Sequence, residues 1–248
     1  MRKIIEKKEN WKNYWDDCGK KYSEGWKNGL LSELSKKEND FIQKYFKQSL
    51  KKKVLDIGVG NGRILNNYIL IDGAEEIYGL DYAESMIDFC KNKFHNENKV
   101  KGLKRCDVSM EEIPFDFGFD FISAVRVLKY SSNWMEILKK ISKKLNDNGL
   151  FVFTMPNKHS ITSLNKYFLT NETKQNRTTI KELRDVLGMI GFDIIEITSF
   201  TKLPDIFYQL SKNKYYAKLI LFIEKLLEIL FGDKFLGRFF FVAVKNKS

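Results

Sequence analysis

Short apolar runs alternate along this chain with stretches in which apolar residues recur every three or four positions. The runs predict buried strands, at residues 54–57, 77–80, 100–106, 119–127, 150–155, 192–198 and 239–244. The other stretches predict amphipathic helices, among them residues 40–50, 83–94, 134–145, 180–191 and 205–231. Strands that alternate with helices form parallel sheets. The pattern therefore predicts a doubly wound α/β sheet with helices on both faces and between the first five strands.

The first strand runs directly into a glycine-rich turn. It carries an acidic residue, Asp56, followed at alternate positions by Gly58, Gly60 and Gly62. A strand, a glycine turn and a helix bring bare backbone against a nucleotide-like ligand. A dinucleotide site has the spacing G-x-G-x-x-G, but its third glycine would fall at position 63, where the chain has Arg63. The carboxylate of Asp56 also favours a ligand that carries a cation.

These residues carry a family resemblance. Asp56 and the three glycines match D/E-x-G-x-G-x-G, and the turn resembles the first motif of the class I S-adenosylmethionine (SAM) methyltransferases. The segment from Val127 to Tyr130 resembles the signature that follows the fourth strand in the small-molecule branch of this family. That branch includes the ubiquinone and menaquinone biosynthesis methyltransferases. The resemblance implies a seven-stranded Rossmann-like sheet in the order 3-2-1-4-5-7-6, with the seventh strand antiparallel. It also implies SAM as cofactor and S-adenosylhomocysteine (SAH) as product.

The resemblance further implies a set of cofactor contacts. Asp81 closes the second strand about 20 residues beyond the glycines, where a carboxylate accepts from ribose hydroxyls; the alternative is the N-cap of the next helix. Asp107 matches the residue that accepts a hydrogen bond from the adenine amine. Val108 matches the next residue, whose backbone N–H contacts the adenine ring. Met86 matches a position against adenine, and Tyr22 one at the methionine end. The full expected set is Tyr22, Asp56, Gly58, Gly60, Gly62, Asp81, Tyr82, Met86, Asp107, Val108 and Val125.

Methyl transfer from an activated donor depends mainly on proximity and alignment. A general base is needed only where the nucleophile carries a high-pKa proton. His159, after the fifth strand, is placed to act as that base, with a solvated loop residue as the alternative. Tyr130, after the fourth strand, is a candidate to orient the acceptor. No spacing of Cys, His or acidic residues indicates a metal site.

The domain plan follows from composition along the chain. Residues 1–36 are polar and rich in aromatic residues, which predicts a helical cap, and residues 37–248 form the SAM-binding domain. Insertions are expected at 157–178 and at 201–235, the second one helical and placed before the last strand. The part of it at 215–231 is apolar on more than one face and requires cover. The cap is the favoured cover and would form a lid with it over the acceptor pocket; a second subunit, an apolar substrate or a membrane surface are the alternatives.

The net charge and two absent motifs favour a small-molecule partner over nucleic acid or a membrane surface. The 248 residues carry a net charge of +11, mostly from scattered lysines, so nucleic acid and membrane-surface contact are both disfavoured as partners. The Asn/Asp-Pro-Pro-Tyr/Phe motif of DNA amino-methyltransferases and the Pro-Cys of RNA cytosine enzymes are absent. We expect a cytoplasmic enzyme, monomer or homodimer, that methylates an O or N of a small molecule such as a sugar, natural product, lipid or quinone precursor. The alternatives are an RNA methyltransferase and a catalytically silent SAM-binding subunit.

Overall fold

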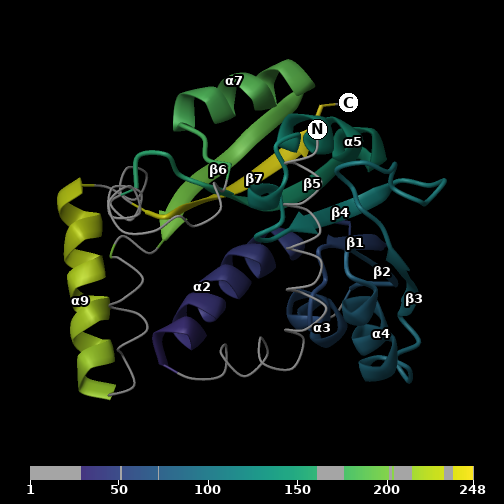
Figure 1. The fold of residues 1–248 in the computed structure, drawn as a ribbon, viewed down its shortest axis with the longest axis horizontal. Helices are drawn as coiled ribbons and strands as arrows, with labels where there is room; N and C mark the ends of the chain where they lie inside the picture. Colours follow the sequence, from purple (N-terminus) through teal and green to yellow (C-terminus); the bar gives the residue numbers. More distant parts are fainter. Residues whose placement is uncertain are drawn as a thin grey trace, which may run out of the picture.

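The computed structural model describes residues 29–50, 52–71, 73–160, 176–200, 203, 214–231 and 237–247. Its elements alternate between helix and strand over most of the chain (Figure 1). In order they are α2 (Gly29–Phe46), β1 (Lys53–Ile57), α3 (Arg63–Leu70), β2 (Glu76–Asp81), α4 (Glu84–Lys93), β3 (Val100–Arg105), β4 (Phe119–Ala124), the 3₁₀ helix η1 (Leu128–Tyr130), α5 (Trp134–Lys144), β5 (Leu145–Pro156), α7 (Ile180–Ile190), β6 (Phe192–Phe200), α9 (Lys214–Phe231) and β7 (Phe239–Asn246).

The strands form one seven-stranded sheet in the order β3-β2-β1-β4-β5-β7-β6. Strands β1 to β5 pair in parallel, whereas β7 runs antiparallel to both β5 and β6. The predicted strand order and the predicted antiparallel strand are therefore confirmed. All parallel strands present their carboxyl ends at one edge of the sheet, which is where open α/β sheets bind ligands.

Two apolar layers sandwich the sheet. On one face α5 and α7 pack against the strands, for example through Trp134 and Leu183. On the other face α2, α3 and α4 contribute Phe46, Tyr68 and Ile87 (Figure 1). Because both faces are covered, β4 is buried along its whole length, as expected for a central parallel strand.

One expected helix is missing. Residues 106–118, between β3 and β4, contain no helix, so the prediction of helices between all of the first five strands is wrong at this point. Pro114 lacks the N–H that a helix interior requires. The rings of Phe115, Phe117 and Phe119 instead gather within 5.6 Å of the Tyr78 ring, between centroids. Aromatic packing on the sheet thus takes the place of a crossover helix.

The other differences concern boundaries. Helix α2 begins at Gly29 instead of residue 40, and it continues across the boundary predicted at 36/37. The described part of α9, Lys214–Phe231, lies within the helix predicted at 205–231, and residues 205–213 lie outside the described residues. Residues 1–28, with most of the predicted cap, lie outside the described residues, as does most of the predicted insertion at 157–178. The two ends of that insertion are joined by a bridge between Asn157 and Thr178.

Helix α9 lies at the edge of the molecule, away from the sheet (Figure 1). Ile220 and Glu224 on its inner side are buried, and Glu224 accepts the backbone N–H of Leu203 at 2.8 Å. Its outer side exposes Tyr215, Leu219, Phe222, Leu226, Ile229 and Leu230. Within the described residues, no helix has both the length and the apolar character to cross a bilayer. What covers the outer side of α9 stays a prediction.

Candidate active site

A cavity of about 180 Å³ opens at the carboxyl edge of the sheet. Its walls come from the turns that follow β1, β2, β3 and β4, together with the first turn of α4 and one side chain of α5. The lining residues are Ile57, Gly58, Gly60, Leu80, Asp81, Tyr82, Met86, Cys106, Asp107, Val108, Ser109, Val125, Arg126, Val127, Tyr130, Ser131 and Ile137. The fold therefore brings together residues that lie far apart in the sequence.

The glycine turn forms the floor of this cavity. Gly58 and Gly60 line it, and both have positive φ, 77° and 49°. A Cβ at Gly58 would lie 2.4 Å from Cγ2 of Val127, so only glycine fits there. Gly62, with φ of 73°, does not line the cavity; it begins α3, and a Cβ there would lie 2.4 Å from the ring of Phe94. The turn thus exposes bare backbone at two positions and packs closely at the third.

Asp81 lies at the cavity wall, at the end of β2. Its Oδ2 accepts the N–H of Gly60 at 2.8 Å, and its Oδ1 accepts the N–H of Ala83 at 3.0 Å. The N-cap residue of α4 is Ala83, so Asp81 does not fill the alternative role of N-cap. Each carboxylate oxygen has two lone pairs. Asp81 can therefore hold the glycine turn and still accept from ribose hydroxyls.

Three residues predicted at the adenine and two further predicted cofactor residues line the same cavity. Asp107, Val108, Tyr82, Met86 and Val125 all line it. The Oδ1 of Asp107 accepts the N–H of Ser109 at 3.0 Å, which fixes the direction of the carboxylate. Tyr22, predicted at the methionine end, lies outside the described residues.

Asp56 lies beneath the cavity and does not line it. The carboxyl group is buried, and its Oδ1 accepts the hydroxyl of Ser123 at 2.6 Å. Among the described residues, its Oδ2 has no hydrogen-bond partner. Burial raises the pKa of Asp56 to about 7, against smaller lowering effects of the Ser123 hydroxyl and the Arg63 charge. The group is therefore a buried acid that is partly protonated at neutral pH.

This pKa predicts a pH-dependent stability. The folded state binds more protons at Asp56 than the unfolded state between about pH 4 and the folded pKa of about 7, so the contribution of Asp56 to stability falls as pH rises through that window. Asn mimics the neutral acid. We expect the advantage in stability of Asp56→Asn over the wild type, measured by urea unfolding, to grow between pH 5 and pH 8 by on the order of 2–3 kcal/mol. A constant difference between the two proteins from pH 5 to pH 8 would contradict the raised pKa.

The two catalytic candidates are separated by the fold. Tyr130, in η1, lines the cavity, and the ammonium of Lys129 lies 4.6 Å from the centroid of its ring. His159 is exposed in the turn after β5 and does not line the cavity; its backbone N–H donates to Oδ1 of Asn157 at 2.9 Å. The structure therefore places Tyr130, and not His159, beside the cofactor residues.

The two cysteines in the described part of the chain are poor nucleophiles. Burial raises the pKa of the Cys106 thiol, which lines the cavity, to about 11, and that of Cys90 to about 12. A thiol with such a pKa is almost wholly protonated at neutral pH. Cys90 instead donates to the carbonyl of Gly60 and supports the glycine turn. Among the described residues, no group of His, Cys, Asp and Glu is placed to hold a metal ion.

Eight of the lining residues were not predicted from the sequence, and Arg126 is the charged one among them. Arg126 follows β4 with φ of 63°, unusual for a residue other than glycine. Its backbone N–H donates to the hydroxyl of Thr154 at 2.7 Å, and its guanidinium donates to Oε1 of Glu38 at 2.9 and 2.7 Å. The one indication in the sequence was that Arg126 is the single charged residue in the segment 121–128.

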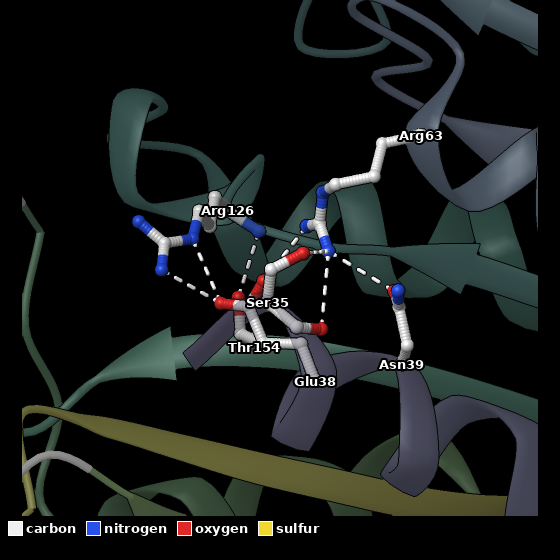
Figure 2. A network of polar contacts seen from close by, with 6 residues as sticks. All are labelled: Ser35, Glu38, Asn39, Arg63, Arg126 and Thr154. Atoms are coloured by element: carbon white, nitrogen blue, oxygen red, sulfur yellow. Dashed lines mark hydrogen bonds and ion pairs between the residues drawn. The ribbon is translucent and has the colours of Figure 1, made fainter. Parts of the chain in front are cut away.

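Glu38 joins this arginine to a second one (Figure 2). Arg63, the residue after the glycine turn, donates to the other carboxylate oxygen of Glu38 at 2.7 Å. It also donates to the side chains of Ser35 and Asn39, at 2.9 and 3.0 Å. The network therefore fixes α2 against both the glycine turn and the segment after β4.

The family of the chain follows from its sequence. The profile of a methyltransferase domain family matches residues 30–197, which is most of the sheet and every described lining residue. The chain belongs to this family. It is a class I, SAM-dependent methyltransferase, and the cavity holds the kinds of group that SAM would need: bare backbone at Gly58 and Gly60, and in Asp81 and Asp107 carboxylates able to accept from hydroxyl and amine donors.

Relatives and solved structures agree with this methyltransferase fold. An uncharacterised protein of Methanocaldococcus jannaschii is 28% identical over 245 residues, with 86% of this chain and 90% of that protein covered. A malonyl-[acyl-carrier protein] O-methyltransferase of Legionella pneumophila is 26% identical over 42% of this chain and 36% of its own length. The crystal structure of magnesium protoporphyrin IX methyltransferase from Synechocystis with bound SAH has a TM-score of 0.68 at 13% identity, with 97% and 100% of the chains covered. At that identity the likeness concerns the fold alone.

Proposed function

We propose that this methyltransferase transfers the methyl group of SAM to an O or N of a small-molecule acceptor. The observation that carries the proposal is the composition of the cavity. The carboxylates of Asp81 and Asp107 line the same space as Tyr130 and the segment after β4. Acceptor and cofactor would thus meet in one enclosed site. The name of the Legionella relative, an O-methyltransferase, supports oxygen as one candidate atom.

The residues of this chain supply position and not covalent chemistry. Bound SAM supplies a methyl group already activated for in-line displacement. Holding two reactants in line replaces a bimolecular encounter by an effectively unimolecular step. Asp81, Asp107 and the glycine turn would hold the donor, and Tyr130 would orient the acceptor by a hydrogen bond from its hydroxyl. A cytoplasmic location is proposed with this function, because Cys90 and Cys106 are buried free thiols.

The proposal is tested by following the label from SAM that carries a tritiated methyl group. The purified protein is incubated with a cell extract divided into a small-molecule fraction and an RNA fraction. We expect label in the first fraction and none above background in the second. Label in RNA, together with RNA binding that weakens steeply with salt, would replace the small-molecule proposal by the RNA alternative.

Tyr130 gives a residue-level prediction. Tyr130→Phe keeps the ring against Lys129 and removes the hydroxyl, so we expect turnover with the identified acceptor to fall by about 10–100-fold while SAM affinity stays the same. Steady-state kinetics and calorimetry with SAM measure the two quantities. His159→Ala is the parallel variant for the predicted base. A loss of turnover in His159→Ala and none in Tyr130→Phe would return the catalytic role to His159.

A further inference from the structure

Lysine side chains support the loop that joins β3 to β4. This loop, residues 106–118, contains no helix, so its carbonyl groups accept no intrahelical hydrogen bonds and need partners from elsewhere. Among the described residues, lysine ammonium groups donate to four of these carbonyls: Lys104 to that of Pro114, Lys140 to those of Val108 and Glu111, and Lys144 to that of Phe115. The loop is therefore held by side chains from β3 and α5.

Lys140 contacts one short turn of this loop at two points. The carbonyl of Asp107 closes the turn, because it accepts the N–H groups of Met110 and Glu111 at 2.8 and 2.7 Å. The Nζ of Lys140 donates to the carbonyl of Val108 at 3.3 Å and to the carbonyl of Glu111 at 2.9 Å. A single ammonium group therefore joins the beginning and the end of the turn to α5.

The same turn forms part of the cavity wall. Asp107 and Val108 line the cavity, as does Ile137, which lies one turn before Lys140 in α5. Lys140 is not among the described lining residues, and its side chain is only 16% exposed. A largely buried ammonium group requires hydrogen-bond acceptors. The carboxylate of Glu112 lies 3.8 Å away and is mostly exposed, so the two carbonyls of the turn are the main acceptors.

The other two lysines hold a different part of the loop. Pro114 and Phe115, whose carbonyls accept from Lys104 and Lys144, follow the turn in the sequence and are not among the described lining residues. Lys144 lies on α5, one turn after Lys140. The helix thus makes the same kind of bond twice, once to the cavity wall and once away from it.

We propose that Lys140 is a positioning residue for the adenine end of the cofactor; this inference rests on the proposed function, in which Asp107 and Val108 hold the adenine. The carboxylate of Asp107 would accept from the adenine amine, and the N–H of Val108 would donate to the ring. Both contacts depend on the direction of one turn, and hydrogen bonds weaken steeply when their geometry is disturbed. Lys140 fixes that turn from behind, without contact to the cofactor.

Calorimetry on the full-length protein tests the inference with SAH and its deaminated analogue, S-inosylhomocysteine. The analogue has a carbonyl oxygen in place of the amine and a proton on the adjacent ring nitrogen, so it presents an acceptor to Asp107 and a donor to Val108. We expect the wild type to prefer SAH by about 10–100-fold. Lys140→Met should bind SAH about 10-fold more weakly and the analogue equally well, so the preference falls. Lys140→Arg, which keeps a charged donor, should restore most of it.

Lys144→Met is the matched control, since it removes the same kind of bond from the same helix and loop but away from Asp107. It should keep the wild-type preference for SAH. Melting temperatures are measured for every variant, and Lys140→Gln takes the place of Lys140→Met if that variant does not fold.

The outcomes separate the inference from the proposed function. A lysine with a merely structural role would lower the melting temperature and leave the preference unchanged, so that result in Lys140→Met overturns the inference. An equal loss of preference in Lys144→Met overturns it as well. A wild type that binds SAH without preferring it to the analogue would refute the assignment of adenine to Asp107, and the inference with it. A wild type that binds neither ligand would remove the proposed function itself.

Discussion

Asp81→Ala is expected to weaken SAM binding by about two to four orders of magnitude without unfolding the protein. The expectation rests on two charge-assisted hydrogen bonds from the ribose hydroxyls, each contributing roughly 1.5–3 kcal/mol. The substitution also frees the N–H of Gly60, which Asp81 accepts at 2.8 Å, and so loosens the turn beneath the donor. Both effects act on the cofactor, while the apolar layers on either side of the sheet are untouched.

Calorimetry with SAM and with SAH measures this effect. Both molecules carry the same ribose, so the loss should be equal for the two. Asp88→Ala is the matched control: it removes a carboxylate from α4, where Asp88 is exposed and pairs with Lys91, and it should leave both affinities unchanged. Wild-type affinity in Asp81→Ala, or a loss confined to SAM, would refute the assignment of Asp81 to the ribose.

The cofactor half of the site was accessible from the sequence because its determinants are local. The glycine turn directly follows β1, and Asp81 and Asp107 lie at the ends of β2 and β3, so strand periodicity places them at one edge of the sheet, while the family resemblance supplies their expected roles. The structure brings Gly58, Gly60, Asp81 and Asp107 to a single cavity. The roles of these residues toward SAM stay predictions until the affinities are measured.

The contacts of Arg126 and the orientation of His159 could not be predicted from the sequence in the same way. Arg126 contacts Thr154 and Glu38, which lie 28 and 88 residues away from it in the sequence. No periodicity links an arginine after β4 with a glutamate in α2, because the contact depends on how the helix crosses the sheet. His159 illustrates the converse: its place after β5 was predicted, but the direction of the turn leaves the side chain in solvent.

The helix errors have a related cause. Periodicity identifies apolar spacing but not where a helix begins, so α2 was placed from residue 40 although it begins at Gly29. Neither the cap predicted at 1–36 nor the helix predicted from residue 40 assigned a contact to the polar residues Ser35, Glu38 and Asn39. In the structure they face Arg63 and form the polar contact between α2 and the glycine turn (Figure 2). Buried polar networks of this kind carry no apolar signal.

That network predicts a large loss of stability when Glu38 is removed. Glu38 is 1% exposed and accepts three hydrogen bonds from two guanidinium groups. Removal of one partner from a buried ion pair leaves charges without compensation and typically costs about 3–5 kcal/mol. We expect Glu38→Ala to lower the free energy of unfolding by about 3 kcal/mol, at the lower end because both arginines are partly exposed and regain some hydration.

Urea unfolding at constant m-value measures this loss. Glu136→Ala is the matched control, since it removes one partner of a fully exposed pair with Lys139 and should leave the urea midpoint unchanged. The network also joins α2 to the glycine turn, because Arg63 directly follows Gly62. Glu38→Ala should therefore weaken SAM binding even at temperatures where the variant is fully folded. A variant with the wild-type midpoint would show that water replaces the carboxylate at both arginines. A variant that is less stable but binds SAM normally would restrict Glu38 to holding α2 on the sheet.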